Sequence, residues 1–322
     1  MTLEIFIDPE TKEPLTKKGS ELVSSKNRFN IIENKIADLL WPRSLPIEDL
    51  KAKMFHEGRA VQYENTLHYT FFTHMLDETK TRNSFISRMN LAPNSKVLEI
   101  ASGTGRDTVL IAQHLGKEGE LHVQDISLDM LKVCFDKMSK IDIKKSFSLS
   151  NAMYLPYPDN YFDAVYSFGG LGEFSDQKKA LQEMARVTKP KGKVVVGDES
   201  VPDYLRTTTF YKILHKTNHM FEAKVPLELL PMEARDVNLS YVLGNSFYLI
   251  DFVVGEGEPN GNFDFEIQGF RGGTYRTRYE GELEGITSET KLKLYSYLQK
   301  KGVSVHNWLE ETIKKELHKK AE

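Results

Sequence analysis

The residues of this sequence best suited to chemistry lie together in one short stretch, residues 97–108. An apolar run with the character of a buried strand, 97–100, leads into a loop and then into a helix that starts near Thr108. The loop contains only small residues: Ala101, Ser102, Gly103, Thr104 and Gly105. Small residues let a ligand approach backbone N–H groups closely, and the start of a helix adds further donors. The stretch therefore predicts a nucleotide-type binding site.

Two carboxylates indicate what such a site would bind. Glu99 stands just before the loop, where it disfavours a phosphate group and suits a cationic amine or sugar hydroxyls. Asp125 ends the next apolar run, 22 residues after Gly103, where it can accept hydrogen bonds from both hydroxyls of a ribose. NAD enzymes also place an acid at this point. However, the third glycine of a dinucleotide fingerprint would fall at Thr108, which argues against NAD.

The elements that position these residues follow a regular order. From residue 97 onward, predicted strands and helices alternate, which is typical of a parallel sheet with both faces covered. After residue 200, the runs 237–243 and 247–254 face each other across residues 244–246, which predicts a β-hairpin. The fold class expected is α/β, with a Rossmann-like sheet that ends in an antiparallel hairpin.

Three segments are expected along the chain. Residues 1–45 read as a small β-rich N-terminal module, and residues 46–254 as the nucleotide-type domain, which begins with a helical, aromatic-rich stretch over 46–90. Residues 255–322 differ in character: predicted strands at Asn262–Gln268 and Thr274–Glu280 precede helices at about 288–301 and 304–320. We expect this last segment to be a strand-plus-helix extension.

Composition excludes several classes of protein. With 43 basic and 46 acidic residues, the net charge of −3 gives no global field for nucleic acid or membranes. The single cysteine, Cys134, rules out an internal disulfide and any multi-cysteine metal cluster. Residues 1–8 lack the basic and apolar regions of a signal peptide, and no apolar run approaches the roughly 18 residues that span a bilayer. We expect a cytoplasmic protein without metal.

Four stretches in order resemble the class I S-adenosylmethionine (SAM) methyltransferases of the type 11, or ubiquinone-biosynthesis-like, branch. Val97–Thr108 resembles their first motif, with Ala101 in place of its first glycine. Asp125–Leu131 is similar to Asp-x-Ser-x-x-Met-Leu, Asn151–Val165 to acid-Ala-x-x-Leu-Pro-Phe-x-Asp-x-Ser-Phe-Asp-x-Val, and Ala180–Gly192 to Ala-Leu-x-Glu-x-x-Arg-Val-Leu-Lys-Pro-Gly-Gly. The resemblance covers about residues 95–200.

The resemblance implies a SAM-dependent methyltransferase and a set of cofactor-binding residues. These are Glu99, Ala101, Ser102, Gly103, Thr104, Gly105, Asp125, Ile126, Asn151, Ala152 and Ser167. Glu99 would orient the methionine amine, Asp125 would bind the ribose, and Asn151 would accept from the adenine amino group. Methyl transfer is an in-line displacement, so the enzyme mainly aligns donor and acceptor, and a base matters only where the acceptor must lose a proton.

Catalytic residues are therefore hard to read from this sequence. The candidates are Glu173, in the loop after the fourth strand, together with Tyr69, His215 and His219. Each has a structural alternative: Glu173 as a solvated loop acid, Tyr69 as a core residue, and the histidines as polar positions on a surface helix.

The residues after the fourth strand narrow the range of methyl acceptors. Methyltransferases that act on base or glutamine nitrogens commonly carry an Asn/Asp-Pro-Pro-Tyr-type motif there, whereas this chain has Ser167-Phe168-Gly169-Gly170. Aromatic residues over 63–75 and 204–221 would suit a lid above a small, partly apolar acceptor. A small-molecule methyl acceptor is therefore the expected partner, and nucleic acid and membranes are not.

The two ends of the chain carry resemblances of their own. Residues 1–45 resemble the zinc-ribbon modules found beside some methyltransferases, but without the cysteine ligands; an irregular hairpin is the alternative. Arg276–Tyr279 and the two helices after it resemble a ribbon-helix-helix unit, which pairs as a dimer and can read DNA. The alternative function is therefore a SAM-binding regulatory protein that binds DNA or a partner, while a simple helical pair or homodimer contact is the plainer interpretation of this end.

Overall fold

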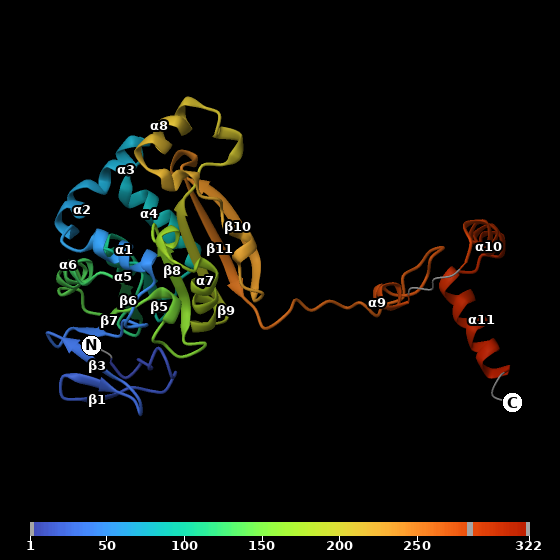
Figure 1. Cartoon of the computed structure of the whole chain (residues 1–322), viewed down its shortest axis with the longest axis horizontal. Coiled ribbons are helices and arrows are strands. Elements are labelled where there is room, and N and C mark those ends of the chain that lie inside the picture. Colours follow the sequence, from blue (N-terminus) through green and yellow to red (C-terminus); the bar gives the residue numbers. More distant parts are fainter. Residues whose placement is uncertain (1–2, 282–285, 320–322) are drawn as a thin grey trace. The chain divides into compact units, whose positions relative to one another are not determined.

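The structure is a computed structural model that describes residues 3–281 and 286–319 (Figure 1). Two compact units make up the chain, Met1–Glu258 and Pro259–Glu322. No helix within the described ranges is long and apolar enough to cross a membrane.

One sheet of eleven strands organises the first unit, in the order β1-β2-β3-β4-β7-β6-β5-β8-β9-β11-β10. The strands are β1 (Thr16–Lys18), β2 (Glu21–Val23), β3 (Arg28–Ile32), β4 (Ile36–Asp38), β5 (Lys96–Ile100), β6 (Glu120–Asp125), β7 (Lys144–Leu149), β8 (Phe162–Phe168), β9 (Thr188–Glu199), β10 (Ala234–Val242) and β11 (Phe247–Val254). Strands β7, β6, β5, β8 and β9 pair in parallel, whereas β11 runs antiparallel to both β9 and β10. The predicted Rossmann-like sheet with a terminal antiparallel hairpin is confirmed.

Helices cover both faces of this sheet, in agreement with the nearly continuous burial of the central strands β5, β6 and β8. They are α1 (Ile47–His56), α2 (Ala60–Thr66), α3 (His68–Thr73), α4 (Glu78–Ile86), α5 (Arg106–Gln113), α6 (Leu128–Met138), α7 (Gln177–Val187) and α8 (Thr209–Thr217). Short 3-10 turns lie at Ser87–Met89, Ala152–Tyr154, Leu171–Glu173, Asp203–Leu205, His219–Glu222, Leu227–Leu229 and Leu243–Asn245. The helical stretch expected over 46–90 is thus four helices and a 3-10 turn rather than one run.

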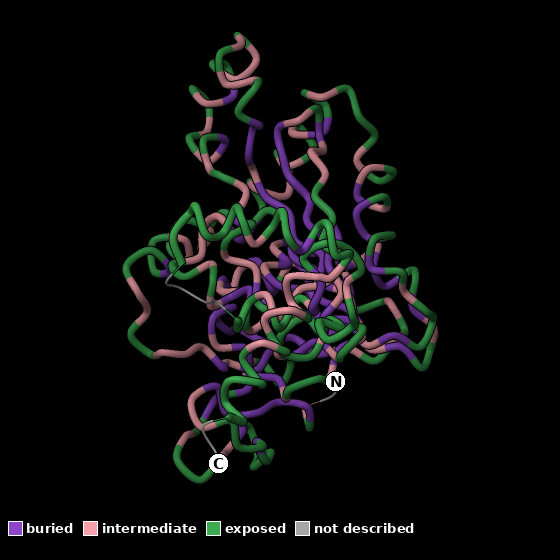
Figure 2. Tube along the Cα trace, turned by 90° about the vertical axis from the view of Figure 1, so that its right-hand side faces the viewer, coloured by how far each residue is buried: buried purple, intermediate pink, exposed green. Residues whose placement is uncertain are grey.

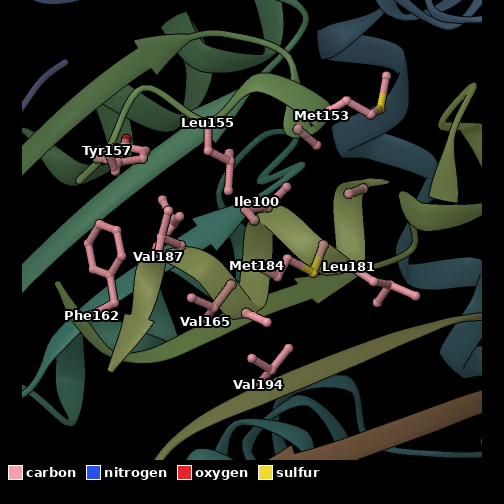
Figure 3. Packing of buried hydrophobic residues seen from close by; sticks show 14 of the residues in the cluster. Ile100, Met153, Leu155, Tyr157, Phe162, Val165, Leu181, Met184, Val187 and Val194 are labelled. Carbon is pink, nitrogen blue, oxygen red and sulfur yellow. The ribbon is translucent and has the colours of Figure 1, made fainter. Parts of the chain in front are cut away.

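Successive strand residues face opposite cores. On one face, α7 buries Leu181, Met184 and Val187 beside Val165 of β8 and Val194 of β9 (Figure 3). On the other face, side chains of α4, α5 and α6 pack against the neighbouring strand positions, among them Val97, Ala164 and Val195. The central strands β5, β6 and β8 are buried along nearly their whole length, and Figure 2 shows buried stretches of the trace gathered in the interior. Burial on both faces explains the nearly continuous apolar runs of these strands.

The N-terminal strands β1–β4, which lie in the stretch expected as a small β-rich module over residues 1–45, are part of this sheet. Strand β4 pairs in parallel with β7, so that Ala37 lies opposite Ser148 and Asp38 opposite Leu149. Side chains such as Phe6 belong to the same buried cluster as α7. The extra strands therefore extend the sheet and share its core.

The second unit, Pro259–Glu322, differs from its sequence-based expectation in one respect. The helices appear as predicted, α10 (Ser288–Lys301) and α11 (Val305–Lys319). The predicted strand at Thr274–Glu280 is instead the helix α9 (Tyr275–Glu280), and Asn262–Gln268 forms no strand. Thr274 and Thr277 form a reciprocal capping box that starts this helix. The ribbon-helix-helix interpretation, which needs a strand here, is therefore wrong for the described residues.

Candidate functional site

The carboxyl ends of β5, β6, β7 and β8 meet at the point where strand order reverses beside β5. In open α/β sheets, ligands bind at this switch point. Two adjoining cavities lie here, and the loop between β5 and α5 contributes to both. Their shared wall consists of His56, Tyr63, Ala101, Gly103, Gly169 and Glu173.

The loop after β5 is held open by left-handed backbone and by the neighbouring strand. Ala101, Gly103 and Gly105 have positive φ angles of 55°, 54° and 84°. The Gly103 N–H donates to Asp125 Oδ2 at 2.8 Å, and the Ala101 N–H donates to Gln124 Oε1 at 3.1 Å. The end of β6 therefore fixes the course of the loop.

The smaller cavity is lined by the ends of β6 and β7. Asp125, Ile126, Asn151 and Ala152 contribute to its wall, and Asp49 of α1 faces them. Burial raises the pKa of Asp125 above its ordinary value, although backbone N–H groups of Ser127 and Gly103 counter the effect. A buried carboxylate of this kind gains most when a ligand brings hydroxyl donors to it.

Asn151 makes different contacts from those that its sequence position suggests. Its side-chain oxygen accepts from the Met153 N–H at 3.1 Å, and its amide donates to Asp49 Oδ2 at 3.0 Å. Asp49 Oδ1 in turn accepts from the Ser175 N–H at 2.9 Å. Asp49 therefore fastens α1 to the wall of the smaller cavity, which the sequence did not reveal.

The larger cavity, of about 300 Å³, holds several buried oxygen atoms without partners. Glu99 Oε2, Ser102 Oγ and Asp107 Oδ1 are buried and make no hydrogen bond, and all three residues line this cavity. Burial, reinforced by the nearby Asp107 carboxylate, raises the pKa of Glu99 well above its ordinary value. Three clustered acceptors fit the three N–H donors of an ammonium group.

A buried arginine balances part of this acidic cluster. Arg82 of α4 donates to Asp107 Oδ2 at 2.7 Å and to Glu78 Oε1 at 2.8 Å, and its guanidinium lies 4.7 Å from the centre of the Phe71 ring. Burial lowers the pKa of Arg82, but the carboxylates outweigh this and raise it. Arg82 therefore places a positive charge against the Asp107 carboxylate, beside Glu99.

Helices α1 and α2 close over the loop through polar contacts. Glu64 of α2 accepts from Thr104 Oγ1 at 2.5 Å, and the Gly58 N–H donates to Asp129 Oδ2 at 2.8 Å. The His56 ring lies with Nε2 2.8 Å from Glu173 Oε2. The Tyr63 ring stands 3.6 Å from the point where a Cβ on Gly103 would lie. From the sequence, this region stands out only by its many aromatic residues. Two of them, Tyr63 and Phe71, line the larger cavity.

The structure brings most of the predicted cofactor residues together. Those that line one or both cavities are Glu99, Ala101, Ser102, Gly103, Thr104, Asp125, Ile126, Asn151 and Ala152. Gly105 lines neither of the two. Instead it packs against α6, where a Cβ would lie 2.6 Å from Cys134 Sγ. Ser167 is buried within β8, away from both cavities.

Of the predicted catalytic candidates, only Glu173 reaches the cavities. Tyr69 is 58% exposed on α3 and lines neither cavity, which contradicts its alternative as a core residue. His215 of α8 pairs with Glu222, with Nε2 3.0 Å from Oε2, and contacts His219, outside both cavities. His215 and His219 thus agree with their alternative as polar surface positions, His215 on α8 and His219 in the 3-10 turn after it.

Comparison with known proteins agrees with this geometry. Residues 69–222 match the model of the ubiE/COQ5 methyltransferase family. A ubiquinone/menaquinone biosynthesis C-methyltransferase UbiE from Cupriavidus metallidurans is 36% identical over 140 residues, which are 44% of this chain and 54% of that protein. The UbiE of Burkholderia cenocepacia is 42% identical over 111 residues, covering 34% and 46% of the two chains. The chain thus spans about half the length of these curated relatives.

Among solved structures, a phosphoethanolamine N-methyltransferase 2 from Haemonchus contortus in complex with SAM is similar, with a TM-score of 0.49 and 14% sequence identity. The similarity covers 67% of this chain and 62% of that one. Residues 69–222 are thus similar, in sequence and in the strand order of the sheet, to the class I SAM-dependent methyltransferases of the ubiquinone-biosynthesis-like branch.

Proposed function

We propose that this protein transfers the methyl group of SAM to a small-molecule acceptor. The observation that carries the proposal is the arrangement of two adjoining cavities around one glycine loop, with a carboxylate ready for each half of SAM. When bound, SAM supplies an electrophilic methyl group on a positively charged sulfur. The residues of this chain bind, orient and shield the reacting groups.

The smaller cavity suits the adenosine half of SAM. Asp125 offers a buried carboxylate to the ribose hydroxyls, and Ile126 and Ala152 offer apolar walls. Asn151 is already paired with Asp49 and Met153, so either Asp49 or a rearranged Asn151 would meet the adenine amino group.

The larger cavity suits the methionine half and leaves room for an acceptor. The unpartnered oxygens of Glu99, Ser102 and Asp107 would accept from the methionine ammonium group. Because a cation favours the ionised carboxylate, ligand binding would bring Glu99 into its charged form. Ser167 and Gly105 have no place in this arrangement.

The acceptor would lie among aromatic side chains at the far side of the larger cavity. Phe168 and Phe247 stack there, with ring centroids 5.5 Å apart and planes 21° apart. Phe55 and Leu243 line the same cavity. Phe55, Leu243 and Phe247 lie outside the matched residues 69–222, so segments beyond the family match contribute to this half of the cavity.

The names of the relatives support carbon as the acceptor atom. Both UbiE proteins are C-methyltransferases of ubiquinone/menaquinone biosynthesis. An aromatic acceptor would match the stacked rings of Phe168 and Phe247 in the larger cavity.

A homodimer through the C-terminal unit is a separate proposal. The exposed Leu292 of α10 and Leu317 of α11 support it, and the mass of the protein in solution would test it.

Titration of the protein with S-adenosylhomocysteine (SAH), followed by calorimetry, tests the proposed function. Glu99→Gln keeps the shape of the side chain but removes its charge, and should weaken SAH binding at least about tenfold, because a charged hydrogen bond to the ammonium is lost. Asp136→Asn, at an exposed position on α6, is the matched control and should bind as the wild type does. Wild-type protein that fails to bind SAH at millimolar concentration would refute the proposal.

A further inference from the structure

The His56–Glu173 pair occupies the shared wall of the two cavities. His56 ends α1 and Glu173 lies in the 3-10 turn after β8, so two distant segments of the chain bring the pair together. Both residues line the smaller and the larger cavity. If the adenosine and methionine halves of SAM occupy one cavity each, the sulfur that joins them must lie near this wall.

The geometry leaves one ring nitrogen of His56 free to take a proton. Nε2 lies 2.8 Å from Glu173 Oε2, so the Nε2–H donates to the carboxylate and Nδ1 carries the lone pair. Phe55 and Tyr63 hold the ring edge-on, with centroids 5.1 and 6.0 Å away and interplanar angles of 88°. A carboxylate that fixes the tautomer of a histidine and leaves its other nitrogen as the base is a recurring catalytic arrangement.

The charges around His56 come from several elements. Glu173 faces it from the turn after β8, Asp125 from β6, and Arg59 from the segment between α1 and α2. Asp49 of α1 and the phenol of Tyr63 share the wall of the smaller cavity. Burial lowers the pKa of His56, but the hydrogen bond and charge of Glu173 outweigh burial and raise it above its ordinary value.

We propose that His56 is a catalytic residue, the base that takes the proton that the acceptor loses on methylation, and that Glu173 positions it. The proposal rests on the proposed function. An electron pair of the acceptor would form the new bond to the methyl carbon, and the bond between the acceptor atom and its hydrogen would break, leaving its electron pair on the acceptor. The electron pair of the broken carbon–sulfur bond would stay on sulfur. The proton would go to Nδ1 of His56 and from there to water.

Titration of His56 by NMR tests its place beside the sulfonium without the need for an acceptor. Protein labelled with ¹⁵N-histidine is titrated in its SAM and SAH complexes, and His56→Gln assigns the signal. SAM carries a positive charge on sulfur and SAH does not. The pH midpoint of the His56 titration should therefore lie about one pH unit lower in the SAM complex than in the SAH complex. His215, which forms a similar pair with Glu222 outside the cavities, is the matched control, and its NMR signals should be the same in both complexes.

The outcomes separate this inference from the proposed function. Failure to bind SAH refutes the proposed function, whereas binding with equal His56 midpoints in both complexes overturns the role of His56. Glu173→Gln should lower the His56 midpoint in both complexes, since the carboxylate that raises it is gone.

Activity gives a second readout on three probes: 1,4-dihydroxynaphthalene, catechol and ethanolamine. On any probe that the wild type methylates, His56→Gln should lower kcat at least about 100-fold with KM for SAM unchanged within about twofold. Glu173→Gln should move the acidic limb of the pH profile to lower pH. His215→Gln should match the wild type, and a His56→Gln variant with wild-type kcat would overturn the proposal.

Discussion

The carboxylate of Asp125 accepts the Gly103 N–H at 2.8 Å, so one side chain at the end of β6 holds the turn that follows β5. The same carboxylate accepts the Ser127 N–H at 2.8 Å and thereby supports the start of α6. Asp125 is thus both a structural anchor of the loop and the proposed partner of the ribose.

This double role predicts different effects for two substitutions. Asp125→Asn keeps one acceptor oxygen, enough for either Gly103 or Ser127, but loses the second acceptor and the charge. It should weaken SAH binding about 10- to 100-fold and lower Tm less than Asp125→Ala does. Asp125→Ala removes both contacts, and should weaken binding at least about 100-fold and also lower Tm. Calorimetry and thermal melts check this, and wild-type affinity in Asp125→Ala would contradict the assignment.

Gly105 should resist substitution for reasons of packing. It has a φ of 84°, and a Cβ there would lie 2.6 Å from Cys134 Sγ and 3.1 Å from Cys134 Cα. Gly105→Ala should therefore lower the free energy of unfolding by about 2–4 kcal/mol. The control is Gly19→Ala, with a φ of 63° and no atom within 4 Å of the new Cβ, which should cost only about 1 kcal/mol. If both substitutions lower the free energy of unfolding in urea equally, backbone strain alone explains the cost of Gly105→Ala.

Glu120 should make stability depend on pH in the acidic range. A hydrogen bond with His122 and another from the Tyr161 hydroxyl, at 2.6 Å, outweigh burial and lower the pKa of Glu120 to about 2. Because the pKa is lower in the folded protein, the stabilisation is full above the unfolded value of about 4.3 and is lost as pH falls towards 2.

Urea unfolding at pH 7, 4 and 3 tests this dependence. Glu120→Gln should lower the free energy of unfolding by about 2 kcal/mol at pH 7. Its difference from the wild type should shrink as pH falls below about 4.5. Glu118→Gln is the control, since the side chain of Glu118 is 82% exposed and pairs only with Lys144. A loss from Glu120→Gln that is constant with pH would point to packing instead of charge.

Removal of the second unit should leave cofactor binding intact. All residues that line the two cavities belong to Met1–Glu258, which has its own buried clusters. A chain that ends at Glu258 should bind SAH within about twofold of the full chain and melt with a similar transition. A large loss of affinity would show that Pro259–Glu322 contributes to the site.

The parts of the fold that sequence predicts are those governed by local rules. The helix Gln177–Val187 and the terminal hairpin follow from periodicity and turn residues, and the loop after β5 follows from its small residues. The error at Thr274–Glu280 has a local cause as well, because Thr274 and Thr277 cap a helix in a segment whose alternation resembles a strand.

The parts that sequence misses depend on distant contacts. His56 and Glu173 are 117 residues apart, and Asp49 and Asn151 are 102 apart, so no spacing rule links them. Glu173 was a candidate from its place after the fourth strand, but its partner lies on a helix with no distinguishing motif. The pairing of β4 with β7 is similar, since short strands of three to six residues carry little register information.

The extension of the sheet by β1–β4 also bears on how the protein avoids self-association. Without these strands, β7 would be an open edge, able to pair with a strand of another molecule and seed aggregation. Instead the outermost strand is β1, only three residues long, fully exposed and carrying Lys17 and Lys18. The opposite edge, β10, is interrupted between Arg235 and Asn238 by a bulge. Both edges are thus poor templates for strand addition.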